Sequence, residues 1–513
     1  MGGAEQAPGP VAGHRIDPAI LREYDIRGRY GHDLAEADAF AIGAGFARVL
    51  REAVAADGAA LRPGVAVGRD GRLSSPALEG ALVAGLVAGG VDVWRIGIGP
   101  TPMLYYAEAS MPQVQGGIQV TGSHNPPDHN GFKIVLGGRP FFGADLVRLG
   151  ALAVVEQDRI AQRQVIGAVG GGGGSIHPAQ PGAIREVDLG AAYVDRLLSA
   201  LDGVGLPGTE AGDRLAKLRI AWDAGNGAAG PIVAALAARL PGEHTLLFCE
   251  VNGHFPNHHP DPSDERNLAD ILRAVVSNRL DFGLAFDGDG DRLGVIDGQG
   301  RVLWGDELLV PFAQDVLRDH SGATILADVK TSQVVFDAIA AMGGQPQMWK
   351  SGHSLIKSRM KETGALLGGE MTGHVFFADR WYGFDDALYA ALRLIAAVAR
   401  GGRSVTQWRD AIPRLQTTPE LRFAVDPARK RAVVAEVAER LAAQGVAADT
   451  TDGLRVNEDD GWWLLRASNT QDMLTARAES ATPEGLERLL ARIDAQLAAS
   501  GIVRAGAVPP AAG

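Results

Sequence analysis

Short runs rich in β-branched residues alternate along most of the chain with longer runs rich in alanine and leucine. A short β-branched run is typical of a buried strand, and a longer alanine- and leucine-rich run is typical of a helix. The alternation predicts three successive strand–helix–strand cycles. Their elements are Val65–Gly68, Ser75–Gly89 and Val91–Ile96; Leu218–Trp222, Pro231–Leu240 and Thr245–Val251; and Ala323–Asp328, Thr331–Met342 and Gln347–Trp349.

The last part of the chain follows a different pattern. A strand at Leu421–Val425 and a helix at Ala428–Gln444 precede two predicted strands, Gly461–Arg466 and Met473–Ala478, and a final helix at Glu484–Ala499. Two successive strands without an intervening helix are typical of an α+β unit. The pattern therefore predicts an α/β fold of three related α/β domains, whose sheets are mainly parallel, and a C-terminal α+β domain.

Length and glycine content indicate where these domains meet. A chain of 513 residues is too long for one core, since a domain usually holds about 100–200 residues. A run of five glycines at 170–174 is typical of a flexible segment. We expect a flexible tail at 1–14, domain 1 at 15–166, a glycine-rich linker or insertion at 167–182, domain 2 at 183–301, domain 3 at 302–413 and domain 4 at 414–513.

Charge and cysteine content narrow the classes of function. Lys and Arg number 49 against 61 Asp and Glu, and the net charge of −12 argues against general nucleic-acid binding. Any anionic substrate must therefore meet positive charge that is local. The single cysteine, Cys249, suits a reducing cytoplasm. The longest strongly apolar run, Ala81–Val91, is too short for a membrane span, and the first residues do not resemble a signal peptide. We expect a cytoplasmic protein that binds neither nucleic acid nor membrane.

A loop of small and polar residues, Thr121–Pro127, follows a predicted strand. Its glycine lets the backbone approach a ligand, and its Asn-Pro-Pro turn keeps it stiff. Ser123 is therefore a candidate nucleophile or phosphate carrier, although an ordinary polar turn has a similar composition. The loop is not the Gly-x-Ser-x-Gly elbow of α/β-hydrolases, because Asn125 stands where the second glycine is required.

Three carboxylates alternate with glycine in a second loop, Asp287–Arg292. Carboxylates at this spacing converge on one hard divalent cation, and the alternative is a solvated acidic turn. An EF-hand would need glycine and a carboxylate where Arg292 and Gly298 stand. A phosphatase of the haloacid-dehalogenase type also begins with Asp-x-Asp, but Thr or Val usually stands at its fifth position. The candidate metal ligands are Asp287, Asp289 and Asp291.

Two further loops carry groups that bind sugars and anions. In Gly368–His374, the carboxylate of Glu370 and the hydroxyl of Thr372 can hydrogen-bond adjacent sugar hydroxyls. The loop after Leu465 combines a guanidinium, two hydroxyls and an amide, which form a compact oxyanion cradle. Each loop alone is also compatible with a strand end or a polar turn. The members of the cradle are Arg466, Ser468, Asn469 and Thr470.

The four loops occur in one order, and together they resemble the α-D-phosphohexomutase family. The segments REYDIRG, TGSHNPPDHNGFKIV, DGDGDR, WKSGHSLIK, GGEMTGHVFF and RASNT are most similar to its bacterial phosphomannomutase/phosphoglucomutase branch. The similarity runs from about Arg22 to about Thr475. Phosphoglucosamine mutases typically carry Gln where this chain has Met371, and they are the alternative within the family.

The resemblance implies four domains around a central cleft, each contributing one loop. It implies a phosphorylated Ser123 that would bind Mg²⁺ together with the three aspartates. It also implies sugar contacts at Glu370 and Thr372, and phosphate contacts at the four residues of the cradle. The further cleft residues that match the family are Tyr24, Arg27, His124, Lys133, Arg292, Lys330, His353 and His374.

The implied reaction is the reversible conversion of a hexose 1-phosphate, of glucose or mannose, to the 6-phosphate. Hexose 1,6-bisphosphate would be both intermediate and activator, and we expect a monomer whose partners are phosphosugars. Arg27, Arg292 and Lys133 would supply the positive charge that offsets the negative charge of the phosphoryl group. The proton could move through Lys133, His124 or His374, and the sequence does not choose among them.

Two other classes of function stay open. A phosphatase that uses Asp287 as its nucleophile would need no Ser123, and a non-catalytic phosphosugar-binding protein would lose the serine or the aspartates. The chain also departs from the family pattern at two positions. Thr372 stands where serine is more usual, and Asp472 places a negative charge beside the predicted phosphate cradle.

Overall fold

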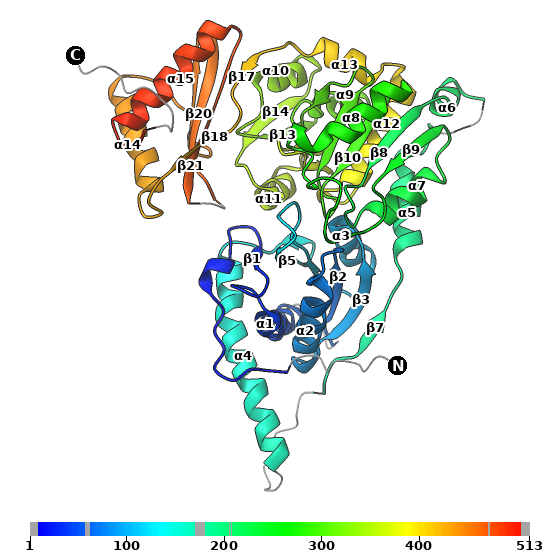
Figure 1. Cartoon of the computed structure of the whole chain (residues 1–513), viewed down its shortest axis with the longest axis vertical. Coiled ribbons are helices and arrows are strands. Elements are labelled where there is room, and N and C mark those ends of the chain that lie inside the picture. The colour runs from blue at the N-terminus through cyan, green and yellow to red at the C-terminus, as the bar shows by residue number, and fades with distance from the viewer. Residues whose placement is uncertain are drawn as a thin grey trace.

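Three of the four sheets repeat one arrangement of strands. In each, two crossovers place strands in parallel, and a hairpin then adds an antiparallel strand beside the last of them. The structure, a computed structural model, describes residues 9–56, 62–169, 180–204, 206, 208–469 and 472–503. Figure 1 shows the first unit below the second and third, and the fourth beside the third.

The first sheet has the strand order β1-β5-β4-β2-β3-β7, with β6 paired to β5. Its central strands are almost wholly buried because helices cover both faces, which explains why their sequences are continuous apolar runs. The strands are β1 (Ile26–Arg29), β2 (Gly64–Arg69), β3 (Asp92–Ile98), β4 (Gly116–Val120), β5 (His129–Leu136), β6 (Arg139–Pro140) and β7 (Ile184–Glu186). The helices are α1 (Glu36–Ala56), α2 (Ser75–Ala88), α3 (Thr101–Ser110) and α4 (Ala144–Val169).

The second and third sheets have the orders β12-β11-β10-β8-β9 and β14-β13-β15-β16. The second unit comprises β8 (Arg219–Asp223), β9 (Glu243–Leu247), β10 (Phe282–Phe286), β11 (Leu293–Asp297), β12 (Val302–Leu303), α5 (Gly190–Leu198), α6 (Glu210–Leu215), α7 (Gly230–Ala237) and α8 (Ala269–Asn278). The third comprises β13 (Thr324–Asp328), β14 (Gln345–Trp349), β15 (Leu367–Gly369), β16 (Val375–Phe377), α9 (Leu309–Asp319), α10 (Gln333–Ala341), α11 (His353–Thr363), α12 (Ala387–Gly401) and α13 (Val405–Ala411).

The fourth unit differs, as the sequence predicts. Its pairings are all antiparallel, in the order β17-β21-β20-β19 with β18 also paired to β21. Apolar side chains on one face of this sheet pack against its helices. The elements are β17 (Gln416–Thr417), β18 (Leu421–Ala424), β19 (Leu454–Glu458), β20 (Gly461–Ala467), β21 (Met473–Ser480), α14 (Lys430–Ala443) and α15 (Pro483–Ala498).

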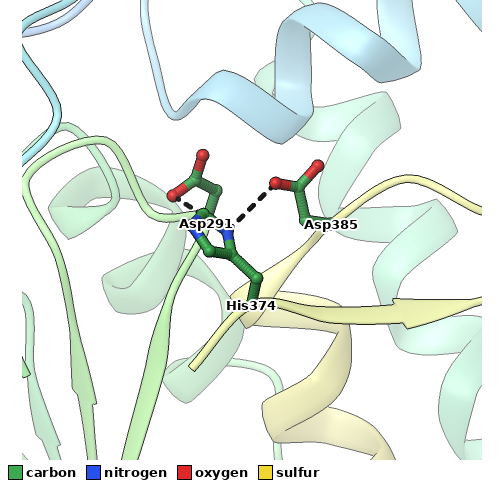
Figure 2. A group of neighbouring side chains, drawn as sticks. All are labelled: Asp291, His374 and Asp385. Carbon is green, nitrogen blue, oxygen red and sulfur yellow. Dashed lines mark ion pairs between the residues drawn. The ribbon is translucent and has the colours of Figure 1, made fainter. Parts of the chain in front are cut away.

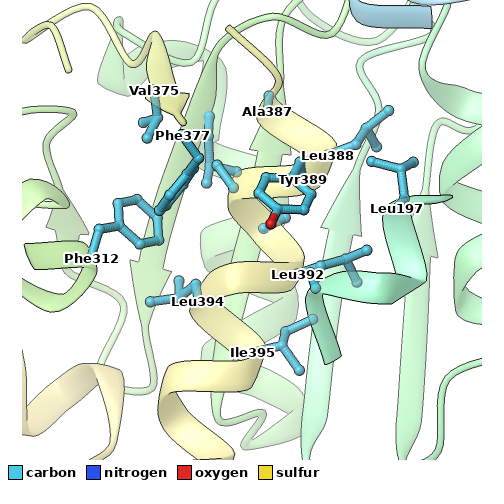
Figure 3. Close-up of a cluster of buried hydrophobic side chains, with 14 of the residues drawn as sticks. Leu197, Phe312, Val375, Phe377, Ala387, Leu388, Tyr389, Leu392, Leu394 and Ile395 are labelled. Carbon is cyan, nitrogen blue, oxygen red and sulfur yellow. The ribbon is translucent and has the colours of Figure 1, made fainter. Parts of the chain in front are cut away.

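The second and third units share a core around α12. This helix is buried on every side over most of its length, and it contacts α5, α6, α9 and β16. Figure 3 shows its side chains Leu388 and Leu392 beside Leu197 of α5, while Phe312 of α9 lies on the other side, next to Phe377. A helix that is apolar all round is stable only when neighbours cover every face, so α12 joins the two units into one packed body.

Three predicted domain limits need correction. The short strand β7 pairs in parallel with β3, and β12 pairs with β11, so residues 184–186 and 302–303 belong to the preceding sheets. Each strand occupies a sheet edge whose hydrogen-bonding groups would otherwise lack a partner. The predicted linker at 167–182 begins inside α4, and its residues 170–179, like residues 1–8 of the predicted tail, lie outside the described residues.

No helix in the described residues has the length and apolar character needed to cross a lipid bilayer.

One hairpin in each unit carries one of the four predicted loops. Residues 121–128 join β4 to β5, residues 287–292 join β10 to β11, and residues 370–374 join β15 to β16. Residues 468–472 join β20 to β21 in the fourth unit. In the first three units the loop leaves the carboxyl end of a parallel strand, the edge where α/β sheets bind ligands. The fold thus brings four loops, far apart in sequence, to one cleft.

Candidate active site

A cavity of about 650 Å³ opens where the four loops meet. Among the described residues that line it, eight are Arg or Lys and five are Asp or Glu. Positive charge is therefore concentrated here although the chain carries a net charge of −12. Thr470 lies outside the described residues. The predicted residues that line the cavity are Tyr24, Arg27, Ser123, His124, Lys133, Arg292, Lys330, His353, Glu370, Thr372, His374, Arg466, Ser468 and Asn469.

The backbone at Ser123 is held in an uncommon conformation, with φ at 51° in the left-handed region. The buried guanidinium of Arg72 braces the loop, because its Nη2 donates to the carbonyl oxygens of Ser123 and Asn125, both at 2.7 Å. Asp70 accepts from Arg72 Nε at 3.1 Å and from the Thr121 hydroxyl at 2.8 Å. Backbone strain persists only where surrounding contacts impose it, and it is most common at functional sites.

The Ser123 hydroxyl lies against the aspartate loop of the second unit. Its Oγ donates to Asp287 Oδ2 at 3.1 Å and lies 3.2 Å from His124 Nδ1. The two loops touch because residue 288 is glycine. A Cβ at Gly288 would lie 2.4 Å from the carbonyl oxygen of Ser123, closer than atoms can approach. The glycine between the aspartates therefore brings the serine and the carboxylates together.

Asp287, Asp289 and Asp291 form a buried cluster in which one carboxylate oxygen of each lies within 4.8 Å of the others. Lys133 Nζ donates to Asp289 Oδ2 at 2.8 Å and also to Asp291. Within the described part of the chain, Asp289 Oδ1 and Asp291 Oδ1 accept no hydrogen bond. Buried oxygens without donors are costly, and a hard divalent cation is the ligand that three such carboxylates bind. The residues present therefore fit a divalent cation.

Burial and charge set the protonation of the groups beside Ser123. Burial and the neighbouring aspartates raise the pKa of Asp287. Burial opposes the charge on Lys133, but the three aspartates outweigh it and raise the pKa of that ammonium group. Burial, and then the positive charges of Arg292 and Arg27, hold the pKa of His124 well below its usual value. Lys133 therefore keeps its proton at neutral pH, whereas the ring of His124 is neutral.

His374 lies between two carboxylates (Figure 2). Its Nδ1 is 3.0 Å from Asp385 Oδ2 and 3.6 Å from Asp291 Oδ1, and Lys357 Nζ donates to Asp385 Oδ1 at 2.8 Å. On the other side of the ring, Arg292 Nε donates to Nε2 at 3.0 Å. Since a guanidinium cannot accept, this contact leaves the proton of a neutral ring on Nδ1, facing the carboxylates. The hydrogen bond from Arg292 therefore orients the ring so that Nδ1 faces the two carboxylates.

The carboxylate of Glu370 is buried at the start of the third loop. Its Oε1 accepts from the backbone N–H of Gly352 at 2.7 Å and from the Ser351 hydroxyl at 3.3 Å. Burial raises the pKa of Glu370. The ring of His353, which follows Gly352, stacks on His374 with centroids 5.4 Å apart. The third loop and the start of α11 therefore form one wall of the cavity.

Charged residues outside the motif hold the predicted phosphate cradle of the fourth unit. Asp452 Oδ2 lies 2.8 Å from Arg466 Nη2 and fixes that guanidinium. Lys430 Nζ donates to the carbonyl oxygen of Ser468 at 3.1 Å and lies 3.3 Å from Asp472 Oδ1. Asp472 therefore places its negative charge beside the cradle, as the sequence indicates, but Lys430 pairs with it and the Asp472 side chain is 62% exposed.

A single hydroxyl ties three units together across the cavity. Tyr24 Oη, from the first unit, donates to the carbonyl oxygen of Ser351 in the third at 2.9 Å. It accepts from Asn469 Nδ2 of the fourth unit at 2.6 Å. Burial raises the pKa of Tyr24, so the hydroxyl remains a neutral donor.

Several residues of the site lie outside the four motifs, and the sequence did not predict them. They hold motif residues in place rather than lining the cavity, and four of them follow no recognisable pattern. Asp70 is different, because it lies two residues after the predicted strand Val65–Gly68, at the edge where functional groups gather. Its position was a usable signal. These supporting residues are Asp70, Arg72, Asp385, Lys430 and Asp452, and Arg422 and Thr475 of the cavity lining were missed as well.

Comparisons with known proteins give the same division into four parts. Residues 19–145, 191–300 and 304–415 match the alpha/beta/alpha domains I, II and III described as phosphoglucomutase/phosphomannomutase. Residues 420–496 match the C-terminal domain of the same description.

Proteins of bacterial origin are similar over almost the full chain. A phosphomannomutase/phosphoglucomutase of Pseudomonas aeruginosa is 41% identical over 476 residues, 92% of this chain and 94% of the relative. A phosphoglucomutase of Neisseria gonorrhoeae is 40% identical over 480 residues, 93% of this chain and 96% of the relative. A crystal structure of a phosphoglucomutase/phosphomannomutase family protein from Burkholderia thailandensis is 37% identical, with a TM-score of 0.80 over 97% of this chain and 99% of that one. Fold, four-domain match and identity agree, and the chain belongs to the phosphoglucomutase/phosphomannomutase family.

Proposed function

We propose that this protein interconverts the 1-phosphates and 6-phosphates of glucose and mannose, with Ser123 as the carrier of the phosphoryl group. The observation that carries the proposal is the position of the Ser123 hydroxyl, 3.1 Å from Asp287 in a cavity that Glu370 and Arg466 also line. A carrier serine, a cation-binding cluster and two sets of ligand-binding groups are what a phosphosugar mutase requires. The names of the relatives support the same substrates.

The reaction would take place in two phosphoryl transfers. The phosphoryl group leaves Ser123 Oγ for the free hydroxyl of a bound hexose monophosphate, which becomes the 1,6-bisphosphate. The bisphosphate then turns end for end, and its other phosphoryl group is transferred to Ser123 Oγ. The product is the isomeric monophosphate, and the enzyme regains its phosphoserine. Added hexose 1,6-bisphosphate would activate the enzyme by phosphorylating an empty Ser123.

Asp287, Asp289, Asp291 and an oxygen of the phosphoserine would hold Mg²⁺. When bound, this ion would offset negative charge on the transferring group. Lys133, whose pKa is raised, would add a fixed positive charge beside the same carboxylates. Arg27 and Arg292 line the same cavity and would contact the remaining phosphate oxygens.

Protons must also move at both ends of each transfer. The neutral ring of His124 lies 3.2 Å from Ser123 Oγ, so we assign it the proton exchange at that atom. Lys133 is a poor acceptor because it is already protonated. His374 also lines the cavity, but its Nε2 accepts from Arg292 and its Nδ1 faces Asp385, so it could take the proton of the attacking hydroxyl only if the contact with Arg292 broke.

The same chain supplies every predicted contact to the sugar and to both phosphates, so we expect a monomer to be active. The phosphoglucosamine mutase alternative has less support, because the similar curated relatives are named for mannose and glucose phosphates. An aspartyl phosphatase would not need the contact between Ser123 and Asp287, nor the sugar-binding groups of Glu370 and Thr372.

A coupled assay tests the proposal. The protein, with Mg²⁺ and a trace of glucose 1,6-bisphosphate, should convert glucose 1-phosphate to glucose 6-phosphate without releasing inorganic phosphate. Ser123→Ala should abolish conversion, because the carrier oxygen is gone. Ser110→Ala, which changes an exposed serine at the end of α3, should leave it intact. Release of phosphate in place of isomerisation would favour the phosphatase and reject the mutase.

Asp289→Asn tests the metal assignment. The amide removes one anionic ligand and one partner of Lys133, so Mg²⁺ affinity should fall by about tenfold or more. Calorimetric titration with Mg²⁺ and the activity of chelator-treated protein measure the effect. If wild type stripped by a chelator turns over as fast as the Mg²⁺-loaded protein, the aspartates do not hold an essential metal.

A further inference from the structure

One row of side chains crosses the fourth sheet beside the phosphate cradle. In the antiparallel register, Arg466 of β20 lies directly opposite Thr475 of β21, and Thr475 lies directly opposite Arg422 of β18. Residues that are directly opposite in an antiparallel sheet project from the same face. The three side chains therefore form one cross-strand row, with the threonine hydroxyl between two guanidinium groups.

The face from which this row projects is the cleft face. The neighbours Leu465, Leu474 and Phe423, one residue away on each strand, are buried in the core against the helices of the fourth unit. Since side chains alternate along a strand, Arg466, Thr475 and Arg422 point the other way. All three line the same cavity as Ser123.

Both guanidinium groups, those of Arg466 and Arg422, have N–H donors that are available to a ligand. Asp452 holds Arg466 through Nη2, and within the described residues no group accepts from Arg466 Nε. Arg422 lies 3.6 Å from Glu420, and its side chain is 60% exposed. Arg422 is therefore weakly held and can turn toward a ligand. The negative charge of Asp472, beside the cradle, is paired with Lys430.

The spacing of the row suits a phosphate. Neighbouring strands lie about 4.8 Å apart, which places the backbones of Arg422 and Arg466 about 10 Å apart with Thr475 midway. Two long arginine side chains can converge across that distance, and their planar forks match the oxygens of a phosphate. The Thr475 hydroxyl adds a donor at the centre of the row.

We propose that Arg422 and Thr475 extend the phosphate cradle, and that together with Arg466 they hold the phosphate that is not being transferred. Nothing in the four sequence motifs includes these two residues. The inference rests on the proposed function, because it assumes a phosphosugar in the cavity. Arg422 would have a positioning role, because it would bind the phosphate that is not being transferred and would not touch the reacting atoms.

Binding to a protein that cannot turn over tests this inference. Glucose 1-phosphate is titrated calorimetrically into full-length Ser123→Ala and into the same protein with Arg422→Ala or Thr475→Val added. Loss of a charge-assisted hydrogen bond should raise the dissociation constant by about tenfold for Arg422→Ala, and loss of a neutral one by about threefold for Thr475→Val. Arg422→Lys should recover part of the affinity, because it keeps the charge but not the fork.

The control is Arg431→Ala, which removes an equal charge from an exposed position on α14 in the same unit. It should leave the dissociation constant unchanged. Equal affinity of the parent and Arg422→Ala proteins would overturn the inference while leaving the proposed function standing, as would an equal loss in Arg431→Ala. Failure of the parent itself to bind glucose 1-phosphate would reject the proposed function, and the inference with it.

Discussion

The residues of the site are of two kinds: those whose chemistry the sequence predicts, and those that hold the predicted residues in position. Ser123 and the three aspartates occur in loops whose composition indicates their chemistry, and the structure brings them into contact. The sequence does not reveal the role of Arg72, because this residue acts through hydrogen bonds to backbone carbonyl groups of a loop about fifty residues away in the sequence. Such a contact depends on tertiary packing, so no local pattern encodes it.

Under the proposed function, Glu370 and Thr372 would set the sugar specificity. The O3 and O4 hydroxyls roughly exchange places when the bisphosphate turns, so Glu370 and Thr372 can hold them in either orientation. Glucose and mannose differ only at C2, and a pocket discriminates weakly where it makes no hydrogen bond. We predict similar kcat/KM for the 1-phosphates of glucose and mannose. Inverting C4 should cost roughly 1–3 kcal/mol, so galactose 1-phosphate should be about tenfold worse or more.

Steady-state kinetics with the three sugar phosphates decide this prediction. Equal kcat/KM for the galactose compound, or a preference of about a hundredfold between the first two, would mean that other groups set the specificity.

At the scale of the elements, strand and helix positions were predictable wherever apolar runs alternate with glycine or polar turns. The predicted strand Leu218–Trp222, for example, is β8, Arg219–Asp223. The long central helix α12 was not predicted, although its run of alanine and leucine is the signal that marks the other helices. The strand β7 was not predicted either, because its three residues are exposed and carry no apolar pattern.

The start of α12 offers a test of this buried environment. Asp386 caps the helix by accepting from Tyr389 N at 2.9 Å, and it also accepts from Tyr193 Oη at 2.7 Å. Burial raises the pKa of Asp386 to about 7. Between about pH 4 and pH 7 the folded state therefore binds a proton that the unfolded state releases, so this group's contribution to stability falls as pH rises through that window.

Asp386→Asn keeps a capping oxygen but cannot ionise. Relative to wild type, the variant should therefore gain stability between about pH 5 and pH 8, by as much as about 3 kcal/mol, because about two pH units of the titration lie in this window. Urea unfolding of both proteins at the two pH values measures the difference. Asp337→Asn, at an exposed position of α10, should show no such gain. A constant difference between Asp386→Asn and wild type would show that Asp386 is ionised in the folded protein.

For the whole molecule, the order of the motifs implied four domains around a cleft, but not how those domains contact one another. The shared core around α12 and the bridge through Tyr24 both depend on residues far apart in sequence. The charge of the whole chain was a useful guide, because the anion-binding groups had to be gathered locally against a net charge of −12, as they are in the cavity.

Tyr24→Phe tests the bridge between the domains. The variant loses the hydroxyl that joins Ser351 to Asn469, so the fourth unit should close less well over the ligand. We expect KM for glucose 1-phosphate to rise by about three- to tenfold, the effect of one lost hydrogen bond, with a smaller change in kcat. Tyr30→Phe, in the same unit but outside the cavity lining, is the matched control. An unchanged KM in Tyr24→Phe would show that the bridge has no part in binding.

The central claim is that Ser123 carries the phosphoryl group, and intact-mass spectrometry with peptide mapping tests it most directly. After incubation with Mg²⁺ and glucose 1,6-bisphosphate, wild type should gain the mass of one phosphoryl group on the peptide that contains Ser123, and Ser123→Ala should gain none. A phosphoryl group found on another residue, or an unmodified protein that nevertheless interconverts the sugar phosphates, would contradict the account.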